Sequence, residues 1–170
     1  MITFPWTYIT HPEACITYTY LILYWVLNNN ARPSLWFRYV DDTFTLFDNK
    51  NTATQFLHYL NNCQTNVKFT VEFEENSTIP FLDILIKRHN HTFSTSIYRK
   101  KTFTGLYTKW DSFTPRKYVY KVNLIRTLTF RCFRICASSS LLRSCLNELR
   151  KLFLQNGYSA GVVSYNINDV

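Results

Sequence analysis

The chain has 170 residues, of which 46% are hydrophobic and 18% aromatic, a size that suits one globular domain or two very small ones. This composition excludes a disordered tail and a membrane bundle. The only three glycines are Gly105, Gly157 and Gly161, which excludes the glycine-rich phosphate loops of dinucleotide-binding folds and P-loop enzymes.

The net charge of +8 is concentrated in the second half of the chain. Residues 1–90 hold six Lys and Arg against eight Asp and Glu, whereas residues 91–170 hold thirteen against three. Aromatic residues are interleaved with basic residues in 98–103 and 130–134, and this mixture favours nucleic acid over a membrane surface as the partner. The alternative is diffuse charge that only favours solubility.

Residues 14–27 form an apolar, tyrosine-rich stretch near the start of the chain. The stretch is too short to span a bilayer, so we expect a buried strand or helix, and no membrane partner. Residues 1–29 match no pattern that we recognise and stay unassigned.

The middle of the chain alternates between strand and helix signals. We expect a hairpin over 35–47 around Asp41-Asp42, and a helix over 53–63 capped by Asn49 or Asn51. A half-exposed strand over 67–74 should follow, and then a second hairpin that pairs 81–87 with 92–99.

After Arg99 the pattern becomes helical. Residues 100–114 read as a basic, aromatic connector, and Pro115 can open a helix whose apolar stripe runs to Cys136. Ser138-Ser139-Ser140 then supplies a break and a new N-cap for a second helix that stops at Asn156-Gly157. Residues 157–170 read as a tail, and the predicted fold class is α+β.

The five cysteines contain no CxxC pair, and we expect buried free thiols in a reducing, intracellular compartment. No secretory signal is evident. Cys132 and Cys136 lie one helical turn apart, which leaves a metal pair as the alternative, although no further ligands lie at finger spacing.

Asp41 and Asp42 are the sharpest chemical signal. Two adjacent carboxylates on a tight β-turn present hard oxygen ligands, which suits paired Mg²⁺ or Mn²⁺ ions in phosphoryl transfer. The alternative is an ordinary turn, in which Asp-Asp is a common dipeptide.

The residues around this turn belong to a longer pattern. Phe37-Arg38-Tyr39-Val40-Asp41-Asp42-Thr43-Phe44 resembles motif C of reverse transcriptases, and its continuation is similar to the reverse transcriptases of Penelope-like retroelements of animals. The similarity covers about residues 30–165. Its further blocks are Ile79–Asp83, Ser96–Lys100, Thr104–Tyr107, Trp110–Ser112, Asn123–Ile125 and Asn156–Tyr158.

The resemblance implies an RNA-directed DNA polymerase palm over 30–99 and a helical thumb over 115–156, a segment also describable as helix-turn-helix. Asp41 and Asp42 would be catalytic and bind Mg²⁺ or Mn²⁺ weakly, and Lys68 matches the lysine that follows motif C. No aspartate precedes Asp41, so we expect a fragment that is inactive alone. Its missing palm and fingers half would come from another chain.

RNA template and DNA primer would then be the partners, and the nucleus the expected location. The alternative function is a helix-turn-helix-like nucleic-acid-binding module without catalysis. The residues that we expect to contact nucleic acid are Arg99, Lys100, Lys101, Lys109, Trp110, Lys117, Lys121, Arg131 and Arg134.

Overall fold

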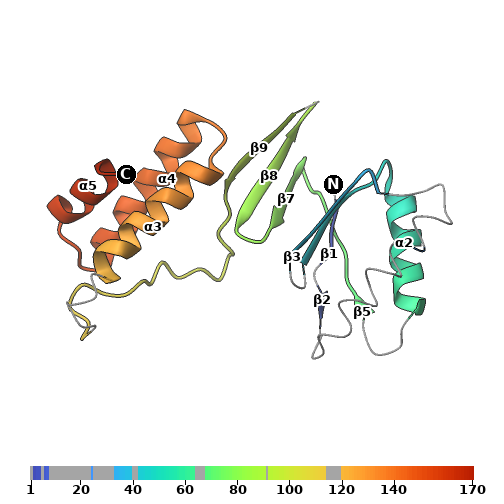
Figure 1. The fold of residues 1–170 in the computed structure, drawn as a ribbon, viewed down its shortest axis with the longest axis horizontal. Helices are drawn as coiled ribbons and strands as arrows, with labels where there is room; N and C mark the ends of the chain where they lie inside the picture. The colour runs from blue at the N-terminus through green and yellow to red at the C-terminus, as the bar shows by residue number, and fades with distance from the viewer. Residues whose placement is uncertain are drawn as a thin grey trace. The chain divides into compact units, whose positions relative to one another are not determined.

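The computed structural model describes residues 2–4, 6–7, 24, 33–39, 42–63, 68–90, 92–113 and 120–170. It contains antiparallel strands and helices in separate stretches, which confirms the predicted α+β class. The chain divides into two compact units, Met1–Leu82 and Asp83–Val170, and each has its own elements (Figure 1).

The first unit is built on a four-stranded sheet with the order β3-β4-β1-β6. Its strands are β1 (Ile2–Phe4), β3 (Leu35–Tyr39), β4 (Asp42–Leu46) and β6 (Glu72–Phe73). β2 (Trp6–Thr7) pairs with β5 (Lys68–Phe69), and β7 (Thr78–Phe81) ends the unit. Helix α2 (Lys50–Cys63) buries Phe56 against Trp36 and Phe47, with ring centroids 5.8 and 5.5 Å apart.

Two local predictions for this unit are confirmed. β3 and β4 form the expected hairpin, in register from the pair Leu35–Leu46 to the pair Tyr39–Asp42. Helix α2 starts after Asn49, whose Oδ1 accepts a hydrogen bond from the Thr52 amide at 2.8 Å. Such a cap satisfies one of the free N–H groups of the first turn.

The prediction of one continuous strand over 67–74 is wrong. The structure has two short strands there, β5 and β6, which pair with different partners. The Asn61 side chain accepts from the Phe69 N–H at 2.6 Å and donates to the Phe69 carbonyl at 3.1 Å. These hydrogen bonds join Phe69 to helix α2. The alternation of apolar and polar residues, from which the strand was predicted, does not reveal this contact.

In its described residues, the second unit joins a hairpin to the helices α3, α4 and α5 (Figure 1). β8 (Ile84–His89) pairs with β9 (Thr92–Ile97), which confirms the second predicted hairpin. The helices are α3 (Tyr120–Ile135), α4 (Ser139–Gln155) and α5 (Ala160–Asn168). The hairpin thus belongs to the compact unit of the helices, whereas the predicted division separated the two at residue 99.

Helix α4 begins and ends as predicted, with Ser138 as its N-cap and Asn156 as its C-cap. The predicted helix start at Pro115 lies outside the described residues. The predicted tail over 157–170 is wrong, because it contains α5. Ser159 caps this helix, and Val163 and Ile167 are buried one turn apart.

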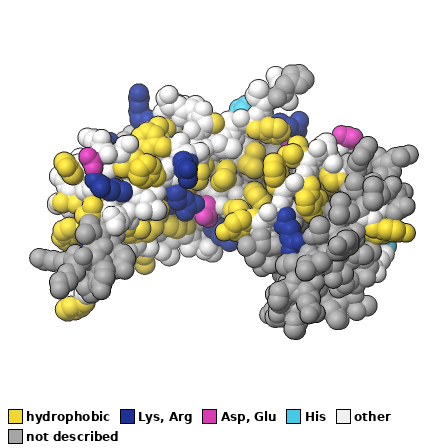
Figure 2. Space-filling model, in the orientation of Figure 1, with side chains coloured by type: hydrophobic (Ala, Val, Ile, Leu, Met, Phe, Trp, Pro, Cys, Tyr) yellow, Lys and Arg dark blue, Asp and Glu magenta, His cyan; other side chains and the backbone are white. Residues whose placement is uncertain are grey.

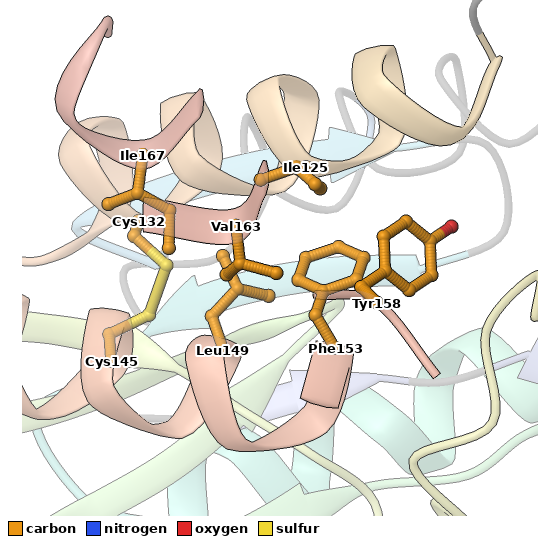
Figure 3. Close-up of a cluster of buried hydrophobic side chains, with 8 residues drawn as sticks. All are labelled: Ile125, Cys132, Cys145, Leu149, Phe153, Tyr158, Val163 and Ile167. Carbon is orange, nitrogen blue, oxygen red and sulfur yellow. A yellow bond between two sulfur atoms is a disulfide. The ribbon is translucent and has the colours of Figure 1, made fainter. Parts of the chain in front are cut away.

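The core of the second unit combines all three helices. Figure 3 shows its buried side chains converging between α3, α4 and α5. Cys132 and Cys145 form a disulfide in this core, with Cα atoms 6.2 Å apart, so the prediction of free thiols is wrong for this pair. The packing of α3 on α4 sets their proximity, which sequence spacing alone does not reveal. Cys136 is a free thiol, and burial raises its pKa.

The disulfide gives a first testable outcome. The disulfide closes a loop between residues 13 apart in sequence, so breaking it raises the conformational entropy of the unfolded chain. We expect Cys145→Ser to lower the free energy of unfolding by about 3 kcal/mol, as measured by urea denaturation under non-reducing conditions.

Cys136→Ser is the matched control, since it removes a thiol outside the bond and should keep the wild-type response to reductant. Identical urea midpoints for the wild type with and without reductant would contradict the cross-link.

Candidate nucleic-acid interface

The connector that follows β9 is held to the turn between α4 and α5 by the buried side chain of Asn156, which is 3% exposed. Its Oδ1 accepts from the Tyr107 N–H at 3.0 Å, and its Nδ2 donates to the Gly105 carbonyl at 2.9 Å. Its backbone carbonyl accepts from the Trp110 N–H at 3.0 Å. One residue therefore fixes the path of residues 105–110.

Gly105 allows this close approach. Its φ is +74°, and an added Cβ would lie 2.7 Å from Cδ2 of Leu152 in α4. A side chain at this position would therefore be strained and would also collide with the helix. The resemblance singled out both Gly105 and Asn156, and the structure shows that the two blocks contact each other.

Aromatic packing anchors the far end of the connector. The Trp110 ring lies 5.2 Å from the Tyr158 ring, and the Tyr158 hydroxyl donates to the Thr108 carbonyl at 2.8 Å. Burial raises the pKa of this phenol. Lys121 donates to the carbonyls of Trp110 and Ser112 and lies over the Trp110 ring. The Lys121 ammonium, the Trp110 carbonyl and the Trp110 ring therefore make contacts that stabilise the connector itself.

Arg99 organises the near end of the connector. Its Nε donates to Glu148 of α4 at 2.8 Å, and its Nη1 donates to the Tyr107 hydroxyl at 3.1 Å. Its guanidinium lies 4.6 Å from the centre of the Phe103 ring. Because a planar fork makes all three contacts, lysine would be a poor substitute here.

The unit Asp83–Val170 contains fifteen Lys and Arg against four Asp and Glu. Three of these acids pair with arginines: Glu148 with Arg99, Asp83 with Arg131, and Asp169 with Arg126. On the face drawn in Figure 2, the carboxylates over the helices lie beside dark-blue basic side chains. The acids therefore neutralise particular arginines and leave a strong positive excess.

The remaining described basic residues of the connector and helices include six that are exposed and make no ion pair with a described residue. They are Lys100, Lys101, Lys109, Arg134, Arg143 and Lys151. Such side chains remain available to phosphates. The sequence prediction named the first four and missed the two on α4, which have no aromatic residue next to them in sequence: Arg143 lies between Leu142 and Ser144, and Lys151 lies between Arg150 and Leu152.

The outer face of α3 combines aromatic and basic side chains. Phe130 is 54% exposed, Phe133 is 47% exposed, and Arg134 lies on the same side of the helix. Two residues between Phe130 and Phe133 in sequence point elsewhere. Arg131 forms an ion pair with Asp83, and Cys132 forms the disulfide in the core. The alternation of rings and charges in 130–134 thus divides between two sides of the helix.

A cleft of about 300 Å³ lies within the same unit. It is lined by residues of the hairpin, connector, α3 and α4, among them Asp83, Tyr98, Arg99, Lys100, Phe103 and Arg131. Three of the predicted contact residues, Arg99, Lys100 and Arg131, therefore meet at one cavity.

The remaining predicted site residues are placed as follows. Asp42 begins β4 opposite Tyr39, whereas Asp41 and Lys117 lie outside the described residues. Lys68, on β5, donates to the Asn61 carbonyl at 3.3 Å. In the part of the chain that the structure describes, no three His, Cys, Asp or Glu side chains gather closely enough to hold a metal. No described helix is long and apolar enough to cross a bilayer.

The model of the animal helix-turn-helix domain matches residues 106–168. This segment begins in the connector and contains α3, α4 and α5. It therefore includes both Asn156 and most of the connector residues that Asn156 holds by hydrogen bonds. The match supports the helix-turn-helix description of the helical segment and does not extend to the predicted palm. Neither a curated protein nor a solved structure matches the chain.

Buried Gly105 and exposed Gly161 provide a matched test. Gly105→Ala should lower the free energy of unfolding by about 1–3 kcal/mol, because the new Cβ meets Leu152 at a positive φ. Gly161→Ala meets nothing within 4 Å inside helix α5 and should raise it by up to about 1 kcal/mol.

Both values are measured by urea denaturation of the full chain. Equal stability of the two variants would contradict the described path of the connector.

Proposed function

We propose that the chain is a nucleic-acid-binding module and that the unit Asp83–Val170 carries the binding surface. The proposal depends on exposed cations that make no ion pair with a described residue and lie near exposed rings in sequence. Lys100 and Lys101 lie near Phe103, and Arg134 lies near Phe130 and Phe133. The match to the animal helix-turn-helix domain supports the same class of partner.

Phosphate neutralisation falls to the connector, α3 and α4. Helix α5 has the sequence AGVVSYNIN, which contains no charged residue, so it contributes shape and polar contacts rather than charge. Rings beside cations are typical of surfaces on which unpaired bases stack. We therefore infer that a single strand, or the end of a hybrid, binds at least as well as plain duplex.

Binding should weaken steeply with salt. If about four to five phosphates are neutralised, log K should fall against log salt with a slope of roughly −3 to −5. Replacing Lys100 and Lys101 together by Gln should make that slope shallower by about 1.5, measured by fluorescence anisotropy with a short single strand.

Lys50 and Lys87, changed together to Gln, form the matched control, since they also remove two charges but lie on α2 and β8. They should leave the slope unchanged. Absence of binding at low salt, or the same slope in both double variants, would rule out this surface.

A second candidate function, a reverse-transcriptase palm remnant, is favoured by the β3–β4 hairpin. The hairpin forms as predicted, and Asp42 stands at the start of β4 with a half-buried side chain. With Asp41 beside it in sequence, this carboxylate would take part in weak Mg²⁺ or Mn²⁺ binding, relieving repulsion between like charges. Polymerisation would need a further carboxylate from another chain.

Paramagnetic Mn²⁺ should therefore broaden the NMR signals of residues 38–45 in the full chain more than those of α2. Asp42→Asn should remove most of this broadening, whereas Asp48→Asn, in the same unit, should not. Broadening that spares residues 38–45 would contradict metal binding at the hairpin.

A further inference from the structure

The cleft in the unit Asp83–Val170 has a volume and lining suited to one small planar group. Its volume of about 300 Å³ lies at the small end of ligand pockets, which favours a single ring system over an extended ligand. Ile97, Leu128 and Leu149 contribute apolar surface from β9, α3 and α4. Such a lining favours a group with an apolar face.

One part of the lining can stack on that face. Phe103 is 37% exposed, so its ring still offers surface beside the Arg99 guanidinium that lies over it. Glu148 and Tyr107 hold Arg99 in place, so the ring and the planar cation are organised before any ligand arrives. Aromatic rings and guanidinium planes are the surfaces on which proteins stack unpaired bases.

Another part of the lining can bond to the edge of that group. Asp83 Oδ2 accepts from Arg131 Nη2 at 2.7 Å, and the two side chains are 65% and 41% exposed. A carboxylate beside a guanidinium presents acceptors next to donors, which complements the donor and acceptor groups along the edge of a nucleobase. Asp83 would also disfavour a phosphate at this position, since like charges repel.

Two lysines at the cleft could neutralise the phosphates of a bound nucleotide. Lys100 belongs to the lining, Lys101 follows it in sequence, and both are exposed. A nucleotide with its base in the cleft and its phosphates toward these lysines would contact both the stacking residues and the cations.

We propose that this cleft is a subsite for one unstacked base of a single-stranded nucleic acid. The Phe103 ring, with Arg99 held over its other face, stacks on the base, Asp83 and Arg131 bond to the edge of the base, and Lys100 neutralises an adjacent phosphate. This inference rests on the proposed nucleic-acid function and adds a reason for preferring unpaired strands.

The test compares two strands that have the same phosphates. The full chain is titrated at low salt with a short deoxyadenylate strand and with an abasic sugar-phosphate strand of equal length. We expect the strand with bases to bind about five-fold more tightly or better. Phe103→Leu should remove this difference, while Phe93→Leu, which changes a half-exposed ring on β9 outside the cleft lining, should keep it.

Three results would overturn the subsite. Equal affinity of the wild type for both strands would do so while leaving the nucleic-acid function intact, and this comparison needs no variant to fold. A base preference that survives in folded Phe103→Leu protein would place the stacking elsewhere. No binding of either strand would overturn the subsite and the proposed function together.

Discussion

The second unit depends on the burial of one amide side chain, that of Asn156. The connector and the α4–α5 turn are about 50 residues apart in sequence, and Asn156 joins them through Tyr107, Gly105 and the Trp110 N–H. Leaving the buried Asn156 side chain without these partners would cost about 1–3 kcal/mol. This cost explains why an extended, basic connector follows a defined path along the helices.

Because the connector is fixed, the charges in it and beside it are divided into two kinds. Arg99 and Lys121 are bound to groups within the unit, whereas Lys100, Lys101 and Lys109 are exposed without a described ion-pair partner. The first kind holds rings and carbonyls in place, and the second is left for phosphates. The connector therefore combines aromatic rings held by internal contacts with exposed positive charges, which is the combination that a single strand needs.

Features governed by neighbouring residues were predictable from the sequence, and features governed by distant residues were not. The Asn49 and Ser138 caps, both hairpins and the stripes of α2 and α4 follow local rules. The Cys132–Cys145 bond, by contrast, depends on how α3 packs on α4. For the site, charge and ring content identified the basic surface, but which cations have internal partners depends on contacts such as that between Arg99 and Glu148.

The most direct measurement of the central claim is a residue-by-residue map of ligand contact by ¹H–¹⁵N NMR of the full chain, titrated with a short single-stranded oligonucleotide. The expected shifts fall in residues 97–110 and 128–134, around the cleft and the outer face of α3, and α2 stays unperturbed. Shifts confined to residues 35–63, or no shifts at low salt, would contradict the assignment of nucleic-acid binding to the second unit.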